Sequence, residues 1–176
     1  MADIAPPRKA ITMKHIILAA LLAVPLPAAA DDEAAILTTI KGIATAADAQ
    51  DWSRLDMKFG DHVTLNQLSL ETDQGARVKE RTVIEIWAEL LPRFDSTRHE
   101  ISQIEVLGVS SIVARATARY HATYDLGGQT WEQTGRLDYV LKNTDAGWRV
   151  VALNTTPEWE NRHLSDLFMP EQPQNS

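Results

Sequence analysis

Three side chains that can exchange protons lie where the pattern of the sequence changes. Asp48 ends a stretch with helical apolar spacing, His99 opens a stretch of alternating residues, and His121 lies within the next alternating stretch. Carboxylates and imidazoles are common proton carriers in general acid–base catalysis. The three residues therefore indicate acid–base chemistry if the fold brings them together, and structural roles if it does not.

The helical pattern leaves two interpretations of Asp48 open. It lies at the edge of the apolar stripe that Ile36, Ile40, Ile43 and Ala47 form at helical spacing. A carboxylate there is either an inward group whose pKa is raised by burial or a residue that ends the helix in a turn. The spacing alone does not decide between these two roles.

Alternation divides residues 114–124 into two faces of a strand. One face carries Arg115, Thr117, Arg119, His121 and Thr123, and the other carries alanines and two tyrosines, Tyr120 and Tyr124. Periodicity does not say which face is concave, so the direction of the His121 side chain stays open. A lone histidine in a strand is commonly a structural residue.

Other chemistries lack their motifs. The chain has no cysteine, no H-E-x-x-H, no glycine-rich phosphate loop and no G-x-S-x-G. Two histidines and a carboxylate could bind iron or zinc, but the usual short spacing between two ligands is missing, so we expect neither metal nor cofactor. The 17 basic and 24 acidic residues give a net charge of −7 without a basic run, which argues against nucleic acid.

The first thirty residues have the order of a secretory signal. Basic residues precede an apolar run over 16–26, and small residues follow it, namely Ala28 and Ala30. The run is about half of the roughly 20 residues that a membrane helix needs. We therefore predict a signal peptide over 1–30, with 1–12 as an upstream extension if translation starts at Met13. The expected mature protein is periplasmic or secreted, without stable membrane insertion; an uncleaved amphipathic anchor is the alternative.

Helices come first in the remaining chain and strands come later. Helical spacing predicts helices over 33–47, 51–55 and 80–94, with a loose strand over 61–70 and a loop over 71–78. Alternation with tight turns predicts an antiparallel meander of four long strands, at 98–107, 111–125, 129–143 and 147–157. A short helix over 157–168 and a polar, disordered tail over 170–176 close the chain.

This order predicts an α+β fold with helices packed on one face of a curved antiparallel sheet. Helices cannot completely fill a strongly curved sheet of this length. The hollow that remains is a natural small-molecule pocket.

Three segments resemble the SnoaL-like proteins of the nuclear transport factor 2-like superfamily. They are Ala47–Leu55 (ADAQDWSRL), Trp87–His99 (WAELLPRFDSTRH) and Gly147–Val150 (GWRV), and the resemblance extends over about residues 33–165. It implies that residues 31–169 form one cone-shaped α+β domain with the helices on the concave face of the sheet. The superfamily holds dehydratases and isomerases as well as non-catalytic binding and dimerisation modules, so the fold does not name an activity.

Within the superfamily, the scytalone dehydratases are the nearest functional resemblance. Asp48 precedes Asp51-Trp52 by three residues, as their catalytic aspartate does, and His99 follows Thr97-Arg98 at the start of a strand. His121 aligns with their second histidine after a short gap. The resemblance implies that His99 exchanges a proton with the substrate, that Asp48 sets its tautomer or charge, and that His121 polarises an oxygen. Two tyrosines of that family are absent here. Ala47 occupies the position of the first, and the position of the second falls near Gln67.

The expected function is acid–base lyase or isomerase chemistry on a small cyclic or aromatic hydroxyl or carbonyl compound. Candidate ligand-binding residues are Trp52, Gln67, Trp87 and Phe94. A non-catalytic ligand-binding module and a dimerisation module are the alternatives. We also expect a homodimer that pairs the outer sheet faces, with its contact at Tyr120, Tyr124, Trp131 and Tyr139.

Overall fold

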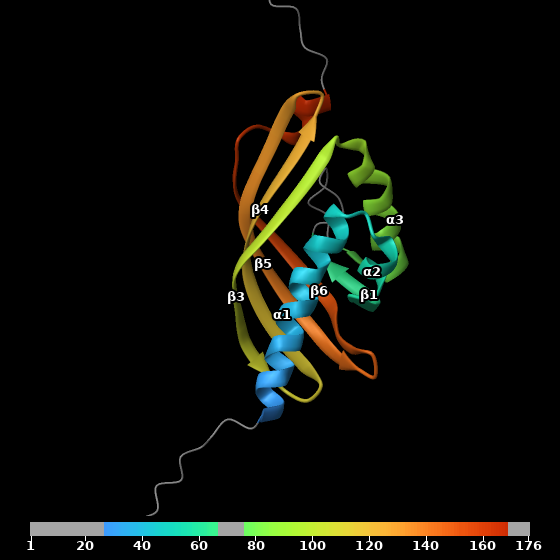
Figure 1. Ribbon diagram of the computed structural model, residues 1–176, viewed down its shortest axis with the longest axis vertical. Helices are drawn as coiled ribbons and strands as arrows, with labels where there is room; N and C mark the ends of the chain where they lie inside the picture. Colours follow the sequence, from blue (N-terminus) through green and yellow to red (C-terminus); the bar gives the residue numbers. More distant parts are fainter. Residues whose placement is uncertain (1–26, 67–75, 169–176) are drawn as a thin grey trace, which may run out of the picture.

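The computed structural model describes residues 27–66 and 76–168, in which helices cover one face of a curved six-stranded sheet (Figure 1). The helical elements are α1 (Pro27–Asp48), α2 (Trp52–Asp56), α3 (Glu80–Leu90), and the 3-10 turns η1 (Leu91–Arg93) and η2 (Leu164–Phe168). The three predicted α-helices are confirmed, although α1 begins before residue 33. The predicted closing helix is shorter, because the last strand continues to Glu160 and only η2 remains helical.

Local chemistry explains where the short helices begin and end. The Asp51 side chain caps α2 by accepting a hydrogen bond from the backbone N–H of Arg54 at 3.0 Å. The helix α3 ends at Leu90, and the chain continues as the 3-10 turn η1, which contains Pro92, before the next strand begins. This turn leads the chain to the strand that carries His99.

The sheet has the order β2-β1-β6-β5-β4-β3. Its strands are β1 (Phe59–Leu65), β2 (Ala76–Lys79), β3 (Ser96–Val109), β4 (Val113–Leu126), β5 (Gln129–Thr144) and β6 (Gly147–Glu160). The four long strands β3 to β6 form the predicted antiparallel meander. The predicted α+β fold with a curved sheet is confirmed, and the sheet differs from a purely antiparallel one only where β1 pairs with β6 in parallel. The short strand β2 also replaces the end of the predicted loop, since it pairs with β1.

The concave face of β4 is the face with the alanines and tyrosines. Ala114, Ala116, Ala118 and Ala122 are at most 3% exposed, and the small side chains leave room for α1 against the sheet. The opposite face carries the arginines and threonines, with the ion pair between Arg119 and Glu158 on neighbouring positions of the outer surface. This division follows from the free energy of burial. Burying apolar side chains against the helices is favourable, whereas burying a charged arginine is costly.

The predicted dimer contact is wrong in its residues. The four aromatic residues assigned to it face the core and are between 2% and 7% exposed, namely Tyr120, Tyr124, Trp131 and Tyr139. They share the inward face of β4 and β5 with the alanines, so they cannot form an outer surface. The homodimer itself stays a prediction.

The core consists of two clusters along the length of α1. The first packs Ile36 and Ile40 of α1 against Phe59, Leu141 and Val150 of the sheet. The second surrounds the end of α1 and contains the aromatic residues Phe94, Tyr124 and Trp131 together with leucines of η1 and η2. Among the residues that the structure describes, no helix has the length and apolar character needed to span a membrane.

Candidate functional site

A cavity of about 140 Å³ lies between the helices and the inner face of the sheet. Residues of both core clusters line it. Half of its apolar wall comes from α1 and α3, namely Ile43, Ala44, Ala47, Trp87 and Leu90, and most of the rest comes from the sheet. The polar groups come from the sheet and include all three tyrosines of the chain: His99, Tyr120, Tyr124, Gln133, Tyr139 and Thr155. A cavity of roughly 150 Å³ is large enough to bind benzene, so this one suits a small ring.

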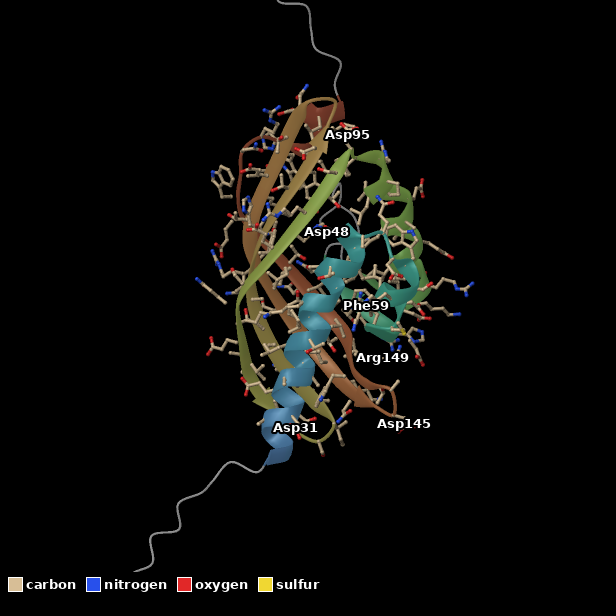
Figure 2. All side chains as sticks on the ribbon, viewed as in Figure 1. Asp31, Asp48, Phe59, Asp95, Asp145 and Arg149 are labelled. Carbon is tan, nitrogen blue, oxygen red and sulfur yellow. The ribbon has the colours of Figure 1, made fainter. Side chains whose placement is uncertain are left out.

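Asp48 and His99 form a hydrogen-bonded pair at the edge of this cavity. His99 Nδ1 lies 2.5 Å from Asp48 Oδ1, and the backbone N–H of His99 donates to Asp48 Oδ2 at 2.8 Å. The Thr97 hydroxyl donates to Oδ1 at 3.3 Å. Asp48 ends α1 (Figure 2), and this helix lies beside β3, the strand that carries His99. The structure therefore favours an inward position of Asp48 over the turn-forming role, but the expected rise in its pKa is wrong, because the pKa is lowered.

Hydrogen bonds keep Asp48 ionised at this position. Burial alone would raise the pKa of its carboxyl, but the side-chain and backbone hydrogen bonds from His99, with that of Thr97, hold the pKa below its ordinary value. A carboxylate at the C-terminus of a helix is otherwise disfavoured by the helix dipole. The donors supplied by β3 offset this cost and fix the carboxylate toward the imidazole.

This pKa shift predicts acid sensitivity. Because the folded pKa of Asp48 lies below its ordinary value of 3.8, its contribution to stability is complete above that pH and is lost as the pH falls through the folded pKa. The free energy of unfolding should therefore drop below about pH 4. The drop should be smaller in Asp48→Asn, which does not titrate, when urea unfolding is followed at several pH values.

The matched control for this experiment is Asp56→Asn, at an exposed position of α2. Hydrogen bonds also lower the pKa of Asp125, so the Asp48→Asn variant should retain part of its acid dependence. An Asp48→Asn curve parallel to that of the wild type would contradict the prediction.

The second nitrogen of His99 meets a buried tyrosine. His99 Nε2 lies 2.8 Å from Tyr124 Oη, and the two rings are perpendicular with centroids 5.3 Å apart. Burial, with smaller effects from Tyr120 and Asp48, raises the pKa of Tyr124, so its hydroxyl remains a neutral donor. One imidazole tautomer fits both neighbours. Its Nδ1 carries the proton and donates to Asp48, and its unprotonated Nε2 accepts from the Tyr124 hydroxyl. The group that can accept a proton from a ligand is then Nε2.

Tyr124 is itself fixed by an aromatic stack. Its ring lies 5.0 Å from that of Phe94 and 4.9 Å from that of Trp131, measured between centroids. The sequence reasoning missed Tyr124 as a site residue. The signal that could have identified it is the alternation itself, because Tyr124 shares a face with Ala122, and Ala122 pairs with His99.

His121 does not join Asp48 and His99, and its predicted place in the site is corrected. It lies one position from Ala122 and therefore points to the outer face of β4, where its side chain is 43% exposed. Its Nε2 is 3.6 Å from a carboxylate oxygen of Glu132, on the same outer face. The sheet separates this imidazole from the cavity.

The predicted ligand-binding residues have different positions. Trp87 lines the cavity. Trp52 packs against both core clusters and does not line the cavity. Phe94 does not line it either, but its ring packs on Tyr124, which does. Gln67 lies outside the described residues. Within the described ranges, no group of three or more His, Asp and Glu side chains is arranged to hold a metal ion.

Comparison with known proteins identifies the family. Residues 28–154 match the SnoaL-like domain family. The chain belongs to this family. The predicted family and cone fold are therefore confirmed. The Asp48–His99 pair and all the cavity-lining residues except Thr155 lie within the matched range.

Solved structures show the same fold at low sequence identity. The Kfla4162 protein of Kribbella flavida has a TM-score of 0.71 and 22% identity, with 77% of this chain and 96% of that chain covered. A candidate scytalone dehydratase of Novosphingobium aromaticivorans has a TM-score of 0.65 and 14% identity, over 76% and 88% of the two chains. The hexachlorocyclohexane dehydrochlorinase LinA-type3 of Novosphingobium barchaimii has a TM-score of 0.66 and 15% identity, over 81% and 97%. No curated protein matches the sequence.

Proposed function

We propose that this SnoaL-like domain is a lyase or isomerase that removes a proton from carbon in a small cyclic or aromatic hydroxyl or carbonyl compound. The observation that carries the proposal is the Asp48–His99 pair, whose imidazole reaches an otherwise mainly apolar cavity. An aspartate that accepts the Nδ1 proton orients the ring and leaves Nε2 as the base. A mainly apolar wall strengthens the interaction between the carboxylate and the imidazolium that forms, because the local dielectric constant is low.

The proposed reaction uses side chains that the cavity contains. The substrate takes the place of the Tyr124 hydroxyl at His99 Nε2, which accepts a proton from the carbon beside a carbonyl group. The electrons of that C–H bond form a C=C bond as the C–O bond at the next carbon breaks. The departing hydroxide takes the proton from His99 and leaves as water. Reprotonation at another carbon, without loss of hydroxide, gives isomerisation.

Two similar structures support an elimination over other uses of the base. Their names describe a dehydratase and a dehydrochlorinase, which remove water and hydrogen chloride. This support is limited to the kind of reaction, because identities of 14% and 15% show a shared fold and not a shared substrate.

Proton exchange at carbon tests the proposal before the natural substrate is identified. A panel of cyclic and aromatic hydroxy-ketones is incubated with the wild-type protein in D₂O, and NMR follows both deuterium incorporation and loss of the hydroxyl group. We expect protein-dependent exchange or dehydration for at least one compound. Compounds that bind without exchange or product would instead favour a passive binding module.

We also propose that the protein is exported and that its mature N-terminus is Asp31. Ala28 and Ala30 supply the small residues at the −3 and −1 positions, and acidic residues follow directly. Cleavage after Ala30 retains Asp32, whose carboxylate accepts a hydrogen bond from Trp148 Nε1 at 2.9 Å, and Ile36, the first core residue of α1. N-terminal sequencing of exported protein should read Asp-Asp-Glu. A membrane-bound chain that still carries residues 16–26 would contradict this prediction.

A further inference from the structure

Three residues that pair across β3, β4 and β5 leave a gap on the inner face of the sheet, because the middle one is a small alanine. His99 pairs with Ala122 on β4, and Ala122 pairs with Gln133 on β5. Paired residues point to the same face, and all three side chains line the cavity. The Cα atoms of His99 and Gln133 are therefore about 10 Å apart, two strand spacings, with only a methyl group between them.

We propose that a ligand ring rests on Ala122 between these two residues and that the Gln133 amide donates a hydrogen bond to an acceptor oxygen on the ring or its substituent. The inference rests on the proposed function for the role of His99 and adds the residue that recognises the oxygen of the substrate. The site would select oxygen-bearing rings, carbonyl compounds above all, over oxygen-free rings of the same shape. Gln133 is then a specificity-determining residue of the cavity.

The direction of the Gln133 amide supports a donor role. The Tyr120 hydroxyl donates to Gln133 Oε1 at 2.7 Å, which occupies the acceptor side of the amide. Gln133 Nε2 has no hydrogen-bond partner among the described residues, and no buried side-chain nitrogen or oxygen there lacks a partner. The amide nitrogen must therefore be accessible to a ligand or to water, and it offers two N–H groups.

The position of Tyr120 is in turn fixed by Gly135. A Cβ atom at residue 135 would lie 2.8 Å from Tyr120 Cε1 and 2.3 Å from the carbonyl oxygen of Thr156, so only glycine leaves room for the ring. Burial, with the nearby charges of Glu158 and Glu160, raises the pKa of Tyr120 and keeps its hydroxyl a donor. Tyr120 is a positioning residue that holds the amide with its N–H groups free.

An oxygen-free ligand would leave the site with an unmatched donor. When such a ligand covers the Gln133 amide, the N–H groups are removed from water without gaining an acceptor, which costs free energy. A carbonyl oxygen on the ligand restores the hydrogen bond. The remaining wall of the cavity is mainly apolar and contacts either ligand equally. The discrimination should therefore depend on Gln133 and on the residue that orients it.

Two ligands of the same shape test this inference by binding alone. Acetophenone and α-methylstyrene differ in a C=O group against a C=CH₂ group, and neither carries a hydroxyl to be eliminated. We expect NMR titration of the wild-type protein to show acetophenone bound about 2- to 10-fold more tightly, the range for one net hydrogen bond. Gln133→Met should lose this preference, because its side chain offers no N–H group to the carbonyl oxygen, and Tyr120→Phe should reduce it.

Matched variants separate the subsite from general damage. Gln129→Met makes the same change on the same strand outside the cavity, where the side chain accepts from Arg162, and should keep the wild-type preference. Ala122→Leu fills the gap without removing a polar group and should weaken both ligands at least tenfold while circular dichroism stays unchanged.

The inference is overturned if the wild-type protein shows no preference, if Gln133→Met retains it, or if Ala122→Leu binds as before. These outcomes are independent of turnover. If the protein shows the Gln133-dependent preference but exchanges no carbon-bound proton, the subsite is supported and the proposed function is not. If it exchanges protons without this preference, the proposed function is supported and the subsite is not.

Discussion

Replacement of His99 by alanine should lower the rate of proton transfer about 10²- to 10⁴-fold, the usual loss when a general base is removed. The expected loss is large because Nε2 of His99 is the group in the cavity that the aspartate prepares to accept a proton. The measurement is the initial rate of deuterium exchange or dehydration, with whichever hydroxy-ketone the wild-type protein converts. Thermal unfolding verifies that the variant remains folded.

His121→Ala is the matched control for this experiment. It removes the same kind of side chain from the adjacent strand, but on the outer face, where His121 is 43% exposed and lies beside Glu132. Its rate should stay within about twofold of the wild type. If His121→Ala loses as much activity as His99→Ala, or if His99→Ala retains activity, the assignment of the base is wrong.

The difference between these two histidines shows what the sequence can and cannot predict. Asp48 and His99 were predictable, because helical spacing places the first at the end of α1 and the turn after η1 places the second at the start of β3. These are local patterns that need no knowledge of the opposite strand. His121 was assigned to the site by its alignment with the second histidine of the scytalone dehydratases, although alternation separated it from Ala122 and Tyr124.

Which face of β4 is inward depends on contacts that are distant in the sequence. Alanines and tyrosines gain by packing against α1 and α3, and arginines on the other face stay hydrated or paired. Because this face is the inward one, Tyr120 and Tyr139 lie in the cavity wall and not in the predicted outer contact. Burial of the whole face, weighed over β4 and β5 together, is the criterion that would have corrected both predictions.

The edge of the sheet was less predictable for a related reason. Tight turns fix the direction of each strand from β3 to β6, so the meander follows from the turn residues. No such turn joins β1 to β6, and their parallel pairing brings together two segments that are far apart in the sequence. The four residues of β2 do alternate, but so short a run does not distinguish a strand from a loop.

The aromatic stack behind the site leads to the second large expected effect. Trp131 is 2% exposed and packs on Tyr124, and its Nε1 donates to the carbonyl oxygen of Arg162 at 3.0 Å. Trp131→Ala removes this buried surface, leaves a cavity and loses the hydrogen bond. It should lower the free energy of unfolding by about 3–5 kcal/mol, the usual cost of such a truncation.

Urea unfolding measures this loss, and Trp159→Ala supplies the control. Trp159 is 52% exposed on β6, so the same substitution there should change the free energy of unfolding by only about 0.5 kcal/mol. Because the Trp131 ring supports Tyr124, and Tyr124 contacts His99 Nε2, the Trp131→Ala protein should also lose part of its activity while it is still folded. A loss of stability below about 1 kcal/mol, far under the usual cost of truncating a buried tryptophan, would mean that this stack does not hold the site together.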